Sequence, residues 1–74
     1  MSNRRYILYD GRAAGGDTSD ATVLCFEDTL REARKSARGF GEAVIFSFIE
    51  VPDPLDPTGA YEIKDETFVE VVRS

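Results

Sequence analysis

The chain has 74 residues, a net charge of −5, one cysteine and no histidine. A chain this short forms one domain, residues 1–74, with a small core that commonly needs a disulfide, a metal or a second subunit. One cysteine forms no internal disulfide, and one thiol without histidine supplies too few ligands for structural zinc. We therefore expect no metal and no cofactor, which leaves self-association as the remaining means of support.

The beginning of the chain predicts no export signal. Its apolar run before Asp10 is four residues long, whereas the core of a signal peptide has about 7–15. The longest nearly apolar run, AVIFSFI, is far below the roughly 20 residues of a membrane helix. We expect a cytoplasmic protein without a membrane partner.

The charge is unevenly distributed. Residues 1–38 sum to +1, whereas residues 39–74 sum to −6. Nonspecific binding of phosphate needs clustered cations, so direct binding of nucleic acid is not expected. A basic protein partner would be attracted to the acidic half.

The first half of the chain begins with two predicted strands. Residues 4–10 (RRYILYD) are aromatic and aliphatic and end at Asp-Gly, which is typical of a strand. Residues 11–21 are small and polar, which predicts a mobile loop. Residues 22–26 (TVLCF) are apolar on both alternating phases, which is typical of a central strand.

The next element is a helix with a start signal and a stop signal. Thr29 and Glu32 form a T-x-x-E capping box, in which each side chain accepts from a backbone N–H. One narrow apolar stripe follows, made of Leu30, Ala33 and Ala37. Gly39 and Gly41 predict the end of the helix, because glycine adopts the left-handed cap without strain.

The second half predicts three further strands. Residues 42–51 are apolar on both phases, and three prolines in 52–59 predict a stiff loop. Residues 60–64 and 67–72 look like two closing strands joined by a tight turn near Lys64–Glu66. The predicted order β-β-α-β-β-β indicates an α+β fold, an antiparallel sheet of four or five strands with one helix on one face.

One short helix covers only part of one sheet face, so apolar side chains should remain on an uncovered face. A large exposed apolar patch usually marks an interface. The alternative is that the two long loops fold over that face. The candidates for the uncovered face are Tyr6 or Ile7, Leu24 or Cys25, Ile45 and Ile49.

The chemistry of the sequence argues against an enzyme. Residues 11–18 (GRAAGGDT) imitate a phosphate-binding loop, but Asp17 stands where that loop needs lysine. Cys25 has no histidine to serve as its base. The loop carboxylates that remain have the positions of turn residues, Asp17, Asp20, Asp53 and Asp56.

Four cations gather on one arc of the predicted helix: Arg31, Arg34, Lys35 and Arg38. They form like-charge i, i+4 pairs, each of which costs a few tenths of a kcal/mol, about 0.2–0.5. Either the arc is a solvated face balanced by carboxylates from neighbouring loops, or it binds an acidic protein patch or a short run of phosphates.

Residues 23–37 (VLCFEDTLREARKSA) resemble the strand-then-helix core of HicB-type antitoxin domains, in which a capped DTLxEA helix follows a sheet. The resemblance implies an antitoxin-type domain as one alternative function.

The whole layout is similar to that of small phage-encoded proteins, some of which are anti-CRISPR inhibitors. The matching pieces are RYILYDGRA (5–13), DTLREA (28–33) and AVIFSFIEV (43–51). This resemblance implies docking on a host protein or nucleoprotein complex, with the acidic half imitating the charge of nucleic acid.

Together these patterns predict a non-catalytic module that binds another protein. The alternative from a different class is a structural homodimer that pairs through a sheet face or an edge strand. The candidate partner-binding residues are Asp53, Asp56, Glu62 and Glu66, the apolar Ile45 and Ile49, and the basic Arg31, Arg34 and Arg38.

Overall fold

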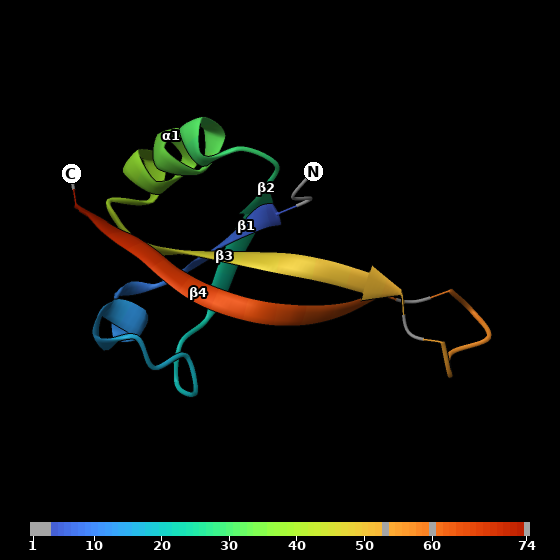
Figure 1. The fold of residues 1–74 in the computed structure, drawn as a ribbon. Helices are drawn as coiled ribbons and strands as arrows, with labels where there is room; N and C mark the ends of the chain where they lie inside the picture. The colour runs from blue at the N-terminus through green and yellow to red at the C-terminus, as the bar shows by residue number, and fades with distance from the viewer. Residues whose placement is uncertain (1–3, 53, 60, 74) are drawn as a thin grey trace.

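The computed structural model describes residues 4–52, 54–59 and 61–73. Its elements are β1 (Arg4–Tyr9), the 3-10 helix η1 (Gly11–Gly15), β2 (Val23–Glu27), α1 (Leu30–Phe40), β3 (Glu42–Pro52) and β4 (Tyr61–Arg73). The strands form one antiparallel sheet in the order β2-β1-β3-β4, with α1 on one face (Figure 1). The predicted α+β class is confirmed.

The sheet differs from the prediction in two places. Residues 22–26 were expected in a central strand, but β2 is an edge strand beside β1. The two predicted closing strands are one strand, β4, and no turn separates them. Instead, β4 contains an extra residue near Asp65, whose φ of 52° bends the strand without ending it.

The predicted helix is confirmed, including its start. The Thr29 hydroxyl accepts from the Glu32 N–H at 3.1 Å, as predicted. The Glu32 carboxylate accepts from the Thr29 hydroxyl at the same distance, whereas the capping box predicted that it accepts from a backbone N–H. The helix ends at the second of the two predicted glycines, because Gly39 is still helical and Gly41, with φ 88°, closes the last turn.

One core lies between α1 and the sheet. Ala33 and Ala37 are fully buried there, and their small size lets the helix lie close to the strands. Leu8 and Ile45 pack against them, so the expectation of an uncovered Ile45 was wrong. Tyr6, Leu24 and Cys25 are partly buried against the same core.

A second core lies on the opposite face. Its sheet residues are Ile7, Tyr9, Val44, Phe46 and Phe48. The segment predicted as a mobile loop covers them, because η1 places a fully buried Ala13 over the sheet, and Ala14 and Ala21 pack beside it. The alternative expectation, a loop folded over this face, is therefore correct for residues 11–21.

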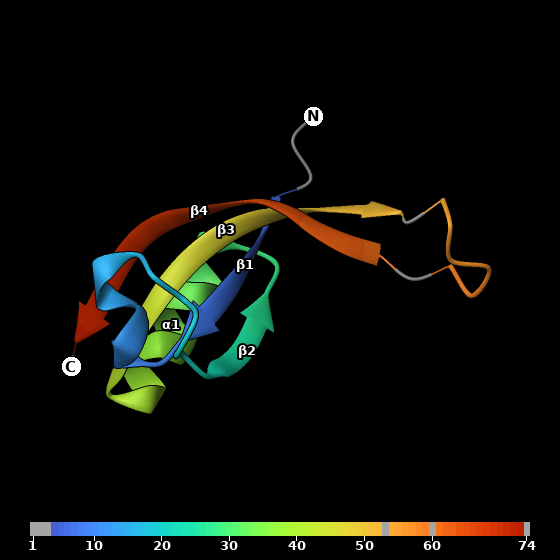
Figure 2. The same ribbon diagram turned by 90° about the horizontal axis from the view of Figure 1, so that it is seen from below.

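The β3–β4 hairpin extends well beyond both cores and gives the molecule its length, with extents of 41 × 27 × 18 Å. We call residues 49–64 the arm. Figures 1 and 2, seen from directions at right angles, both show the arm projecting from one end while α1 lies towards the other. Among the described residues, no helix is long and apolar enough to cross a membrane.

Candidate protein-binding surface

The arm is a two-stranded ribbon with both faces open. Among the described residues, β1 pairs with β3 as far as Arg4–Ile49, and beyond Ile49 only β4 pairs with β3. The pairs that follow are Glu50–Ile63, Val51–Glu62 and Pro52–Tyr61. An isolated ribbon of this kind is marginally stable in water, so its order depends on what holds its base or covers its faces.

The arm also concentrates exposed apolar surface. Four of the eight large apolar side chains that are exposed among the described residues belong to it. They are Val51 (37% exposed), Leu55 (90%), Tyr61 (64%) and Ile63 (41%). Tyr61 and Ile63 share one face of the ribbon, whereas Val51, which pairs with Glu62, is on the other face. Exposed apolar side chains gathered on a projecting element favour a role in interaction.

Carboxylates accompany the apolar side chains. The arm contains four acidic residues and one lysine. At its end, Asp56 accepts from the Thr58 N–H at 2.8 Å and the Thr58 hydroxyl at 2.6 Å. These hydrogen bonds lower the pKa of Asp56, so a defined turn presents a permanent negative charge at neutral pH.

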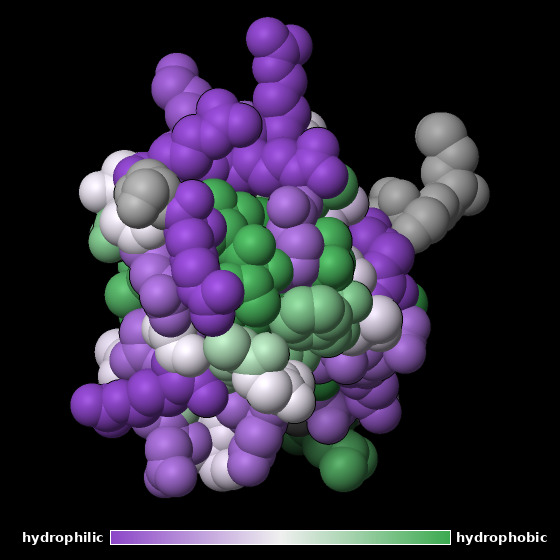
Figure 3. All heavy atoms as spheres, turned by 90° about the vertical axis from the view of Figure 1, so that its left-hand side faces the viewer, coloured by the Kyte–Doolittle hydropathy of each residue, from purple (hydrophilic) through white to green (hydrophobic). Residues whose placement is uncertain are grey.

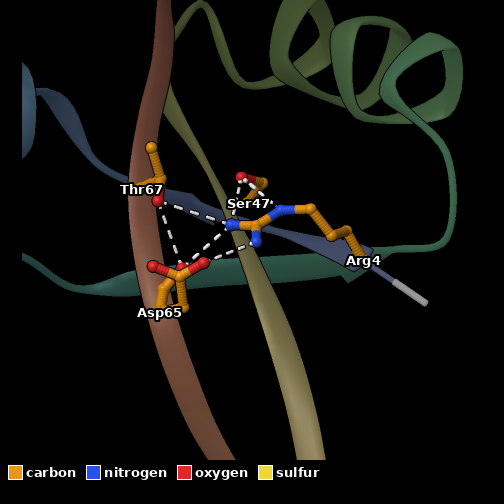
Figure 4. Close-up of polar contacts among 4 residues, drawn as sticks. All are labelled: Arg4, Ser47, Asp65 and Thr67. Atoms are coloured by element: carbon orange, nitrogen blue, oxygen red, sulfur yellow. Dashed lines mark hydrogen bonds and ion pairs between the residues drawn. The ribbon is translucent and has the colours of Figure 1, made fainter. Parts of the chain in front are cut away.

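A polar clasp around Arg4 fixes the base of the arm (Figure 4). The guanidinium donates to the Ser47 hydroxyl at 2.8 Å and reaches across β3 to β4. There it donates to the carboxylate and to the main-chain carbonyl of Asp65, each at 2.8 Å. Thr67 donates to the same carbonyl at 3.2 Å. The clasp therefore joins three strands at the point where the arm leaves the sheet.

Arg5 makes a second attachment on the other side of β1. It binds Glu50 at 2.6 Å, in the first exposed pair of the arm, and Asp28 at 2.8 Å, just before α1. The side-chain hydrogen bonds that Arg5 donates to Glu50 and then to Asp28 raise the pKa of Arg5. The arm is therefore tied to the body by two adjacent arginines.

The acidic residues named from the sequence occupy different places. Asp56 and Glu62 are on the arm, where Glu62 lies 3.7 Å from Lys64. Glu66 lies at the base of the arm and accepts from the Tyr9 hydroxyl. Burial, followed by this hydrogen bond, raises the pKa of Tyr9 to about 12. Asp53 lies outside the described residues.

The remaining candidates separate into three locations. Ile45 is a core residue, and Ile49 is half-buried at the base of the arm. The cations of α1 lie towards the other end of the molecule, and we call Arg31, Arg34, Lys35 and Arg38 the ridge. Of the candidates that the structure describes, Ile49, Asp56 and Glu62 are the ones that belong to the arm.

The ridge is largely uncompensated. Arg34 pairs with Glu70 at 2.6 Å, whereas the other three cations make no ion pair within the described part of the chain. A groove runs between the ridge and β4, lined by Arg34, Arg38, Glu70, Val71, Val72 and Arg73. Figure 3 views this end, where hydrophilic side chains project at the top over a patch of hydrophobic atoms. Neighbouring loops therefore do not balance most of the ridge.

Sequence reasoning missed the arm and its clasp. In residues 61–64 the apolar Tyr61 and Ile63 alternate with charged residues, which is typical of a strand. This pattern was a usable signal for the ribbon, because these residues pair with the end of the long strand predicted at 42–51. The partnership of Arg4 and Asp65 had no local signal, since 61 residues separate them.

Asp17 and Cys25, which were also considered for catalysis, lie in separate parts of the structure. Asp17 accepts from Ser19 within its own turn, and this lowers the pKa of Asp17. Burial and then Glu27 raise the pKa of Cys25, which disfavours its thiolate. No group of three or more metal-ligating side chains occurs among residues 4–52, 54–59 and 61–73.

No protein-family model matches the chain, and no curated protein or solved structure matches it significantly.

Proposed function

We propose that this chain is a non-catalytic protein-binding module that docks through its arm. The observation that carries the proposal is the coincidence of four exposed apolar side chains with three described carboxylates, Glu50, Asp56 and Glu62, on one projecting ribbon. A complementary surface is a partly apolar groove bordered by lysine or arginine. Burying the apolar side chains provides affinity, while the carboxylates steer the encounter and fix the orientation.

The attachment of the arm favours binding over a purely structural role. The clasp around Arg4 and the ion pairs of Arg5 hold the base in one direction. A binding element that is ordered beforehand loses less conformational entropy on association. The two arginines thus prepare the arm for docking without contacting the partner themselves.

The resemblance of the layout to small phage-encoded inhibitors suggests which partners to test first. A host nucleoprotein complex offers cationic grooves that normally hold nucleic acid. The carboxylates of the arm, Glu50, Asp53, Asp56 and Glu62, supply charge of the same sign as phosphates.

Shortening the arm tests the proposal. Residues 51–62 are replaced by Asn-Gly, which joins Glu50 to Ile63 through a two-residue hairpin turn. The full chain and the shortened chain are used to capture proteins from nuclease-treated bacterial lysate, with the exposed substitution Arg12→Ala as a control.

We expect a stoichiometric protein that the full chain and the control retain and the shortened chain loses. The proposal fails if the bound proteins are the same for all three chains, or if none binds. Circular dichroism must show that the shortened chain keeps its helix, because both cores lie outside the removed segment.

A further inference from the structure

We propose that a second copy of this chain is a partner of the arm, and that the arm docks on the ridge of that copy. This inference rests on the proposed function, since it uses the same arm and names one surface that fits it. It also assigns a role to the cations of α1, which the proposed function leaves unused.

The two surfaces have opposite and concentrated charge. Residues 50–66, the arm and its base, hold six carboxylates and one lysine, which together equal the net charge of the whole chain. The ridge spans Arg31 to Arg38 with four cations against Glu32 alone. Three of those cations have no ion-pair partner in the described part of the chain. On the acidic surface, Asp65, Glu50 and Glu62 pair with Arg4, Arg5 and Lys64. Asp56 and Glu66 make no ion pair in the described part of the chain, so both surfaces keep charge that is not balanced within the molecule.

The placement of the surfaces directs the contact between molecules. The arm and α1 lie towards opposite ends of an axis 41 Å long, as Figures 1 and 2 agree. A chain therefore cannot bring its own arm to its own ridge. Because the two surfaces differ, the contact is heterologous and produces head-to-tail chains or rings rather than only a closed dimer.

The surfaces also correspond in length and in apolar character. Arg31 and Arg38 lie about 10 Å apart along the helix axis, and a ribbon of four pairs spans about the same distance. The aliphatic stems of arginine and lysine offer apolar cover, and their charged ends can stack on an aromatic ring such as that of Tyr61. Phe40, half-exposed at the end of α1, extends the apolar part of this surface.

Pairing through the free edge of β4 is the competing route to self-association, and the shape of the strand disfavours it. β4 contains extra residues at two places, near Asp65 and at Val69, where its register with β3 shifts. Bulges of this kind interrupt the row of backbone groups that a second strand would need. The arm and the ridge have no such obstacle.

A charge exchange tests the inference, with sedimentation velocity as the measurement. The arm variant carries Asp56→Lys and Glu62→Lys, and the ridge variant carries Arg31→Glu and Arg38→Glu. A control, Asp17→Lys with Asp20→Lys, changes the net charge as the arm variant does but leaves both surfaces intact.

The unaltered chain and the control should associate in proportion to concentration, and about 0.5 M salt should weaken this association. The arm variant and the ridge variant should each associate at least about tenfold more weakly than the unaltered chain. Mixing them should restore association, because the unaltered arm of the ridge variant then meets the unaltered ridge of the arm variant, and the reversed arm meets the reversed ridge.

The inference is overturned if the unaltered chain stays monomeric at all concentrations, or if the mixture associates no better than either variant alone. Loss of association by the control would also overturn it, since net charge would then be responsible. Circular dichroism of each variant checks folding, and all six altered side chains lie outside both cores. A monomeric chain that still captures a partner through its arm would contradict this inference while leaving the proposed function intact.

Discussion

The guanidinium of Arg4 donates to both the side chain and the main-chain carbonyl of Asp65, at 2.8 Å in each case. Asp65 has a φ of 52°, a conformation that costs most side chains about 1–2 kcal/mol but that aspartate tolerates better. The first strand of the chain therefore holds the bend in the last strand, at the place where the arm begins.

Removing Arg4 should loosen the arm before it affects the cores. Arg4→Ala deletes the bonds to Asp65 and to the buried Ser47, so we expect a loss of about 1–2 kcal/mol in the free energy of unfolding. Urea denaturation measures this loss, and hydrogen exchange should accelerate first at residues 61–66. Arg12→Ala, which removes one 3.3 Å bond at an exposed position, should change stability by less than about 0.5 kcal/mol.

The backbone at Asp65 gives a second prediction. Asp65→Asn keeps an acceptor and tolerates the left-handed conformation, so it should cost less than about 1 kcal/mol. Asp65→Val should cost about 2 kcal/mol more than Asp65→Asn, because a β-branched residue is strained at this φ. Equal stability of the two variants in thermal unfolding would mean that the bend is not maintained in solution.

Ile45 and Ile63 form a matched pair for comparing core and arm. Ile45 is fully buried beneath α1, so Ile45→Ala should lower the free energy of unfolding by about 3 kcal/mol. Ile63 is 41% exposed on the arm, and Ile63→Ala should cost less than about 1 kcal/mol. In partner capture the order should be reversed: Ile63→Ala should weaken binding more than Ile45→Ala does. Similar stability losses for both variants would argue against the placement of these residues.

Because of the raised pKa of Tyr9, we expect the free energy of unfolding to fall at alkaline pH. The pKa of Tyr9 is raised to about 12, above the ordinary value of 10, because burial and the hydrogen bond with Glu66 favour the neutral phenol. Between pH 10 and 12 the unfolded chain releases this proton while the folded chain keeps it. The contribution of Tyr9 is therefore complete below pH 10 and declines as the pH rises to 12.

Urea denaturation at pH 9 and pH 11 measures this decline. Tyr9→Phe lacks the titrating group, so its stability should fall less between these pH values than that of the unaltered chain. The two proteins have the same ionisable side chains apart from Tyr9, so the difference between the two declines isolates Tyr9. Equal declines would contradict the assignment.

The elements with local signals were predicted well. The capping box of Thr29 and Glu32 and the glycine after Phe40 involve neighbouring residues, so they are readable without the fold. The coverage of the second core by Ala13 was harder, because a short stretch of small residues reads as a loop until a sheet lies beneath it. The expectation that Ile45 lies on an uncovered face was wrong, because both phases of β3 are apolar and both faces of the sheet are covered there.

The candidate surface was only partly predictable. The acidity of Asp56 and Glu62 is visible in composition, but their projection on an arm depends on the continuity of β4 through Asp65. A polar run of Lys-Asp-Glu ordinarily indicates a turn. Arg4, distant in sequence, binds the carboxylate and carbonyl of Asp65 and so stabilises a bulge instead.

The most direct test of the arm as the binding surface is hydrogen exchange of the chain, alone and bound to the partner captured from lysate. The arm should supply the contact, so we predict that exchange slows about tenfold or more in residues 49–52 and 61–64 and changes little in η1 and β2. Unchanged exchange in the arm, with protection instead over the exposed side chains of Phe26 and Phe68, would contradict the account.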